Sequence, residues 1–187
     1  MTTLTALSGD YVLDPGRTRI GFVARHRLAT RVRGHFDVFE GAVRLDGADP
    51  AGSTAWLTIR ADSIKTGDRR RDDQLRKTFL LTTAHPVITF VTTSVERTAP
   101  TTFAVTGDLT IRGVTREVTV PFNLIEAEHD VAFTATLPID RSRWRVNWNA
   151  ATTLLISPTV LLELQITAVP RAAQSSQAMP SSSESRR

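Results

Sequence analysis

Four stretches of alternating apolar and polar residues constrain this chain's fold more than any other feature. They cover residues 102–113, 114–124, 130–141 and 161–169. A period of two places one set of side chains on a buried face and the other in water, as in antiparallel strands. Because an open sheet of such strands would expose long edges to aggregation, the pattern favours a closed or nearly closed β-barrel.

The same alternation occurs earlier in the chain. Residues 17–26 place Ile20, Phe22, Ala24 and His26 on one face, and residues 53–64 and 86–97 alternate in the same way. The sequence therefore predicts an all-β fold, a lipocalin-like antiparallel barrel of about eight strands. A barrel of that size is either just filled by side chains or has room for one small or elongated ligand.

Two segments depart from simple alternation. Between residues 32 and 45 the apolar phase shifts by one residue at Val38–Phe39, which predicts a β-bulge there. Residues 67–81 contain few β-branched residues, an acidic N-cap candidate in Asp68, and Leu75 and Phe79 four positions apart. We expect this second segment to form one short helix near the barrel mouth.

Length and composition favour one domain. Of the 187 residues, we assign 1–9 to a flexible N-terminal arm, 10–170 to the barrel and 171–187 to a disordered tail. The tail is rich in serine and nearly free of bulky apolar residues, so it cannot offset its ordering entropy. It also carries half of the net charge of +4. The basic residues of the barrel are scattered, which disfavours a nucleic-acid partner.

The chain has no cysteine, so disulfides and thiolate chemistry are excluded. The N-terminal residues lack the basic and apolar regions of a secretory signal, and no segment has the apolar length of a membrane span. We therefore expect a cytoplasmic protein.

Six motifs in order carry a family resemblance. They are GRTRIGFVARH followed by VRGHF, ADSIKTGDRRRDDQLR, AHPVITF, VTGDLTIRGVTREVTVP and IDRSRW. Together they resemble the YceI-like family of lipocalin-like barrels over about residues 10 to 169. The resemblance implies a barrel with a helix near its mouth and an apolar lumen that binds isoprenoid chains such as polyprenyl phosphates or quinones. It does not imply catalysis.

Two positions depart from the family pattern. Gln74 stands where the family usually has a histidine, and Leu80–Leu81 replace an acidic, aromatic-flanked turn. Both lie in the expected helix, so the identity of the ligand is the least transferable property.

The candidate ligand-binding side chains are those expected to face the lumen or its mouth. They are Ile20, Phe22, His26, Phe36, Phe39, Leu75, Phe79, Phe90, Val105, Leu109, Phe133, Leu137 and Trp144. The small residues Ala24, Gly34, Gly41, Gly107 and Ala135 also fall on the inward phase. We expect them to leave a channel that an apolar chain can fill, at about 0.8 kcal/mol per buried CH₂.

Arg71, Asp72 and Arg76 are head-group candidates, because a guanidinium fork suits a phosphate or carboxylate. The alternative is that Arg71 and Asp72 pair locally and tie the helix to the barrel. The four histidines lack metal-binding spacing, and no nucleotide-binding or α/β-hydrolase motif occurs, so no metal or cofactor is expected.

Three functional hypotheses follow. The first is a lipid-chain binding protein for carriage, storage or stress protection, and it leaves room for peripheral membrane contact and for a homodimer. The second is a small-molecule enzyme that uses His26, Arg71 and Asp72 for acid and base chemistry. The third is an interaction module with a solid core.

Overall fold

A computed structural model describes residues 7–26, 31–127, 129–146 and 156–171. The predicted disordered tail, apart from Arg171, lies outside the described residues. The arm assigned to residues 1–9 is structured from Leu7, which is only 3% exposed. The Leu7 carbonyl accepts a hydrogen bond from the Tyr11 hydroxyl at 3.1 Å.

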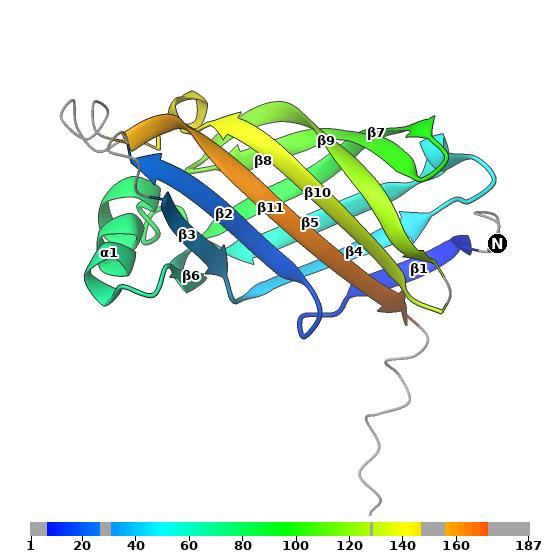
Figure 1. Ribbon diagram of the computed structural model, residues 1–187, viewed down its shortest axis with the longest axis horizontal. Helices are drawn as coiled ribbons and strands as arrows, with labels where there is room; N and C mark the ends of the chain where they lie inside the picture. Colours follow the sequence, from blue (N-terminus) through cyan, green and yellow to red (C-terminus); the bar gives the residue numbers. More distant parts are fainter. Residues whose placement is uncertain (1–6, 27–30, 128, 147–155, 172–187) are drawn as a thin grey trace, which may run out of the picture.

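The described chain forms one antiparallel sheet that closes into a barrel (Figure 1). Its strand segments are β1 (Gly9–Leu13), β2 (Arg19–His26), β3 (Arg31–Phe36), β4 (Phe39–Leu45), β5 (Thr54–Arg60), β6 (Ile64–Lys65), β7 (Val87–Ala99), β8 (Thr102–Ile111), β9 (Val114–Ala127), β10 (Val131–Asp140) and β11 (Ile156–Pro170). The order around the sheet is β1-β4-β5-β7-β8-β9-β10-β11-β2-β3-β6, and pairing of β1 with β11 closes the ring.

Six of these segments lie end to end in pairs, so the barrel has eight strands as predicted. Both β1 and β2 run antiparallel to β11. Next to them, β4 pairs with β1 and β3 pairs with β2. One strand further on, β5 pairs with β4 and β6 pairs with β3. The three interruptions, at residues 14–18, 37–38 and 61–63, therefore lie on neighbouring strands.

The interruption at 37–38 falls where the apolar phase shifts. Gly34 is buried inside the barrel, whereas Val38 is 54% exposed. The phase change predicted at Val38–Phe39 is thus present, but it is a break between β3 and β4 instead of a bulge. Backbone and side-chain groups span the break: the Val38 N–H donates to Ser63 Oγ at 3.1 Å, and the Arg60 N–H donates to the Val38 carbonyl at 2.9 Å.

The helical segment between β6 and β7 has two parts, α1 (Arg69–Gln74) and the π-helical η4 (Leu75–Leu80). Asp68 is the N-cap, since its side chain accepts a hydrogen bond from the Arg71 N–H at 3.0 Å. The segment ends at Leu81, which has the left-handed φ of 50°. It stands at the end of the barrel where β6 is a free sheet edge (Figure 1).

Short 3₁₀ turns complete the described chain: η2 (Pro50–Gly52), η3 (Ala61–Ser63) and η5 (Arg141–Trp144). In η5, Trp144 is fully buried, and its Nε1–H donates to the Leu109 carbonyl at 2.9 Å. This turn therefore anchors the connection after β10 to the end of β8.

Candidate ligand cavity

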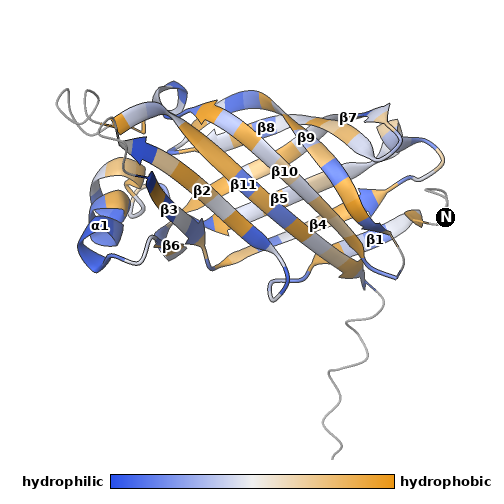
Figure 2. Cartoon of the chain, viewed as in Figure 1, coloured by the Kyte–Doolittle hydropathy of each residue, from blue (hydrophilic) through white to orange (hydrophobic). Residues whose placement is uncertain are grey.

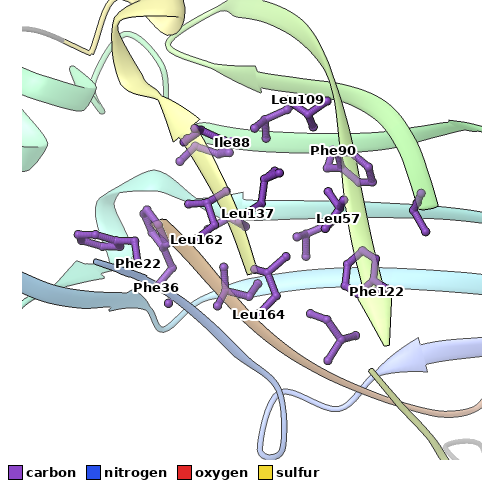
Figure 3. Close-up of a pocket in the computed structure, with 18 of the residues that line it drawn as sticks. Phe22, Phe36, Leu57, Ile88, Phe90, Leu109, Phe122, Leu137, Leu162 and Leu164 are labelled. Atoms are coloured by element: carbon purple, nitrogen blue, oxygen red, sulfur yellow. The ribbon is translucent and has the colours of Figure 1, made fainter. Parts of the chain in front are cut away.

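The barrel encloses a cavity of about 680 Å³. Figure 3 shows side chains from many strands converging on it, among them Phe22, Leu57, Phe90, Phe122 and Leu164. This volume lies within the range of small-molecule sites in proteins. The solid-cored barrel considered from the sequence is thus not what this chain forms.

Strand alternation builds the cavity wall. Residues that pair directly across a ladder share a face, so Phe90 lies beside Leu109 and Phe22 beside Leu162. The apolar lining contributed by β8, β9, β10 and β11 is Phe103, Val105, Leu109, Ile111, Val118, Val120, Phe122, Leu124, Phe133, Leu137, Ile139, Ile156, Val160, Leu162, Leu164 and Ile166. Alternate residues of these four strands therefore face the interior over most of their length.

Two groups of aromatic rings shape the wall. Phe22 and Phe36 lie with ring centroids 6.0 Å apart. Phe133 meets Phe103 at 6.4 Å and Phe122 at 6.3 Å, both edge to face. These contacts fix ring orientations, so the cavity has defined sides.

The inward glycines serve a different purpose from the one expected. A Cβ on Gly34 would lie 2.3 Å from Phe22 Cζ, and a Cβ on Gly107 would lie 2.6 Å from Phe90 Cζ. At Gly41, Leu13 Cδ1 would be 2.9 Å away. The space that the glycines free is thus occupied by neighbouring side chains lying flat against the wall, and the cavity is the space left beyond them.

Most of the predicted apolar side chains line the cavity. They are Ile20, Phe22, Phe36, Leu75, Phe79, Phe90, Val105, Leu109, Phe133 and Leu137. The sequence prediction did not include the lining residues of β9 and β11, such as Phe122 and Leu164, although their even-numbered phase carries the same signal.

Three predicted side chains are not placed there. Trp144 has no exposed surface and does not line the cavity, so the prediction that its side chain faces the lumen is wrong. Phe39 packs against the buried core and is not part of the lining. The side chain of His26 lies outside the described residues, although its backbone pairs with Ile156.

The three head-group candidates differ in position. Arg71 lines the cavity, whereas Asp72 and Arg76 do not. Asp72 is 6% exposed and accepts hydrogen bonds from the Thr66 N–H at 2.8 Å and the Thr66 hydroxyl at 2.5 Å. Arg71 donates through Nε to the same hydroxyl at 2.7 Å and through Nη2 to the Thr66 carbonyl at 3.0 Å. Arg71 and Asp72 therefore tie the helix to the chain after β6, as the alternative interpretation expected, but they do so through Thr66 and not by pairing with each other.

Arg76 satisfies the free edge of the sheet. Its Nε donates to the Asp62 carbonyl at 2.7 Å, and its Nη2 donates to the Ile64 carbonyl at 2.9 Å. Ile64 belongs to β6, which pairs with β3 on one edge and with no described strand on the other, and Asp62 lies just before it in η3. The guanidinium therefore takes the place of a neighbouring strand on the open edge.

Polar groups at the α1 end of the cavity include one that the sequence did not suggest. Arg141 lines the cavity although it is 5% exposed, and it donates to the carbonyls of Val146, Ser157 and Ile156 at 2.5, 3.1 and 3.2 Å. Burial lowers the pKa of Arg141, while Asp140 opposes that effect. Gln74, one of the departures from the family pattern, also lines the cavity.

No group of three or more histidine, aspartate or glutamate side chains that could hold a metal ion occurs within the described ranges. In the same part of the chain, no helix is long and apolar enough to cross a bilayer. Arg71 and Asp72, which the enzyme hypothesis pairs with His26, are both bound to Thr66.

The chain matches the YceI-like domain over residues 11–168. It belongs to the YceI-like family. A UPF0312 protein of Staphylococcus aureus (strain USA300) is 32% identical over 150 residues, which cover 76% of this chain and 85% of that protein. Protein YceI of Shigella flexneri is 35% identical over 124 residues, 65% of this chain and 64% of its own length.

Solved structures agree with the YceI-like fold. Burkholderia cenocepacia BcnA superposes with a TM-score of 0.79 at 27% identity and covers 84% of this chain and 99% of its own. A polyisoprenoid binding domain from Saccharophagus degradans superposes with a TM-score of 0.71 at 21% identity, with coverage of 86% and 98%. The second likeness concerns the fold alone.

Proposed function

We propose that this YceI-like protein binds one long apolar chain, an isoprenoid, an isoprenoid quinone or a related lipid, inside the barrel and carries or stores it. The observation that supports this proposal is the cavity of about 680 Å³ with its nearly continuous apolar lining. Each methylene that moves from water into such a site contributes about 0.8 kcal/mol. The polyisoprenoid binding domain of the structural neighbour is a second, weaker support.

We further propose that the polar head of the ligand lies at the α1 end. Arg71 and Arg141 both line that part of the cavity. Two nitrogens of Arg71 bind Thr66, and its Nη1 makes no hydrogen bond within the described part of the chain. A guanidinium nitrogen in that position is a suitable donor for a phosphate or quinone oxygen.

Ligand binding is tested with protein purified from cells without detergent. Solvent extraction followed by mass spectrometry is expected to release a long-chain lipid. After lipid removal, the protein should bind a fluorescent polyprenol with saturable stoichiometry. A protein that is empty and also fails to bind polyprenols and quinones would refute the proposal.

A matched pair of variants locates the site. Ala24 lines the cavity, whereas Ala42 pairs with Trp56 on the outer face of β4. Ala24→Phe places a ring in the cavity and is expected to lower polyprenol affinity at least 10-fold, since several methylenes lose their site at about 0.8 kcal/mol each. Ala42→Phe should bind like the wild type. Equal affinity of both variants would place the ligand elsewhere.

A further inference from the structure

The charge at one end of the barrel is unbalanced. The β2–β3 hairpin, the α1–η4 segment, the β8–β9 turn and η5 all lie at this end (Figure 1). We call it the cationic end, and define it by the exposed basic residues of those four elements, of the start of β9 and of the position directly after η5. In Figure 2, α1 and the adjoining ends of β2 and β3 have hydrophilic colours.

Within the described ranges, nine exposed arginine and lysine side chains form this surface. The hairpin supplies Arg25, Arg31 and Arg33. The helical segment supplies Arg69, Arg70 and Lys77. The region around η5 supplies Arg116, Arg143 and Arg145, with Arg116 Nε donating to the Arg143 carbonyl at 3.4 Å. None of the nine takes part in an ion pair of the described chain.

Most of the exposed aspartates at the same end are already engaged. Asp62 pairs with Arg60 at 3.0 Å and Asp73 with Arg76 at 3.1 Å. Asp68 caps α1, and Asp140 accepts from the Ser142 N–H and hydroxyl. Glu117, next to Arg116, and its cross-strand partner Asp108 are exposed carboxylates outside every ion pair of the described chain. They offset only a small part of the nine cations, whose field extends into solvent.

The opposite end has a different charge balance. Asp10, Asp49, Glu96 and Glu126 are exposed there, together with the cations Arg19, Arg44 and Arg97, so the two signs nearly balance. The Arg17 guanidinium at that end is held between Asp14 and Asp130, at 2.7 Å from each. The barrel is thus polarised along its length, with its positive charge around α1.

The cationic end is continuous with the cavity. Arg25 belongs to the exposed surface and also lines the cavity. Arg71 and Gln74 of the adjoining helical segment line the cavity as well. A flat anionic surface in contact with these groups would therefore lie against the end of the barrel that contains the unpaired edge of β6.

We propose that the cationic end docks on the surface of an anionic lipid bilayer. Affinity for such a surface rises with every arginine or lysine held near it, so nine cations suit this partner. Single-stranded nucleic acid is disfavoured because it requires exposed stacking rings, and the exposed aromatic of the described chain, Trp56, is on the barrel side. The nature of the cargo rests on the proposed function, but docking itself does not.

Vesicle co-sedimentation with lipid-free protein tests the proposal without any cargo. The full chain is mixed with vesicles of phosphatidylcholine alone or of phosphatidylcholine with phosphatidylglycerol. We expect binding to the anionic vesicles only, and loss of that binding when added salt shortens the screening length. Arg69→Gln/Arg70→Gln should weaken it on the order of 30-fold.

The matched control is Arg19→Gln/Arg44→Gln, which removes two exposed cations away from the cationic end. It should bind anionic vesicles like the wild type, and both variants should keep the wild-type melting temperature. Equal weakening of both variants, equal binding to neutral vesicles, or no binding at low salt would each overturn the proposal. Binding of a single-stranded oligonucleotide in place of vesicles would overturn it as well. Failure to bind polyprenols, with vesicle docking intact, would contradict only the proposed function.

Discussion

Thr92 carries a hydroxyl oxygen that is buried with no hydrogen-bond partner, the only such side-chain atom within the described ranges. The residue lies at a register shift between β7 and β8 and contributes to the cavity lining. An unpaired buried hydroxyl is costly, because it has lost its water without gaining a partner. Retention of a threonine here therefore reduces the stability of the barrel.

Thr92→Val removes that cost at nearly constant volume. We expect the free energy of unfolding to rise by about 1 kcal/mol in urea titrations. Thr106→Val is the control, because the Thr106 hydroxyl bonds that of Thr119 at 2.9 Å, and its loss should give no gain. A destabilised Thr92→Val protein would mean that the hydroxyl has a partner.

Gly34→Ala tests whether the absence of a side chain at Gly34 is needed for the Phe22 ring to pack against the barrel wall. The new Cβ would lie 2.3 Å from Phe22 Cζ and 2.8 Å from the Lys65 carbonyl oxygen, so ring and strand must both shift. We expect a loss of about 1–3 kcal/mol, measured by the same titration. Adding Phe22→Leu should recover part of it. If the double variant is no more stable than Gly34→Ala, the ring contact is not the cause.

At the scale of elements, the breaks in three neighbouring strands are held by polar contacts. Asp37, at the break between β3 and β4, pairs with Lys65 of β6 and with His35 Nε2 at 2.9 Å. The hydrogen bond from Lys65 is the main reason that the pKa of Asp37 is below its ordinary value of 3.8. A carboxyl with a depressed pKa stabilises the fold above its ordinary pKa and loses that effect as the pH falls through its folded value.

Asp37→Asn should therefore cost stability at neutral pH and progressively less in acid. Because the carboxylate is 35% exposed, we expect a loss below about 1 kcal/mol. Unfolding titrations at several pH values, from neutral to below pH 3.8, measure the difference. Asp10→Asn, which changes an exposed carboxyl outside every ion pair of the described chain, should show no such trend. A difference that grows toward low pH would contradict the assignment.

The attachment of α1 depends on one buried carboxylate. Asp72→Ala leaves the Thr66 N–H and hydroxyl without their acceptor. We expect this loss to cost about 1–3 kcal/mol. Hydrogen exchange at α1 should become faster, and polyprenol release should accelerate because Leu75 and Phe79 line the cavity. Asp73→Ala, which removes only an exposed ion pair with Arg76, is the control.

Strand alternation allowed most of the fold to be predicted, because residues such as Val105 and Leu109 repeat with period two on one face. The Pro15–Gly16 dipeptide predicts a turn within the interruption at 14–18, whereas the interruption at 61–63 was not predicted, since it depends on register with neighbouring strands. Trp144 was misplaced because an irregular segment has no period from which to assign a face. Arg76 was predicted to bind the ligand head group, because a sequence cannot reveal which backbone carbonyls lack hydrogen-bond partners that an arginine could supply.

At the scale of the whole molecule, a ligand bound in the cavity should raise the free energy of unfolding of the barrel. Anything that binds the folded state alone stabilises it, by about 2.7 kcal/mol at a ligand concentration 100 times the Kd. For a chain of this size we expect saturating polyprenol to raise the melting temperature by about 5–10 °C. Ala24→Phe should show little shift. An unchanged melting temperature for the wild type at saturation would argue that the polyprenol binds outside the barrel.

The position of β11 has a consequence for biosynthesis. It pairs with β10 on one side and with β1 and β2 on the other, and the Thr18 hydroxyl donates to the Thr167 carbonyl across 149 residues of sequence. A nascent chain on the ribosome therefore has no closed ring until translation passes this last strand. Loading of the proposed lipid would then be post-translational, and a chaperone that shields the unpaired edges of β10 and of the β1–β2 strand would act before the lipid binds.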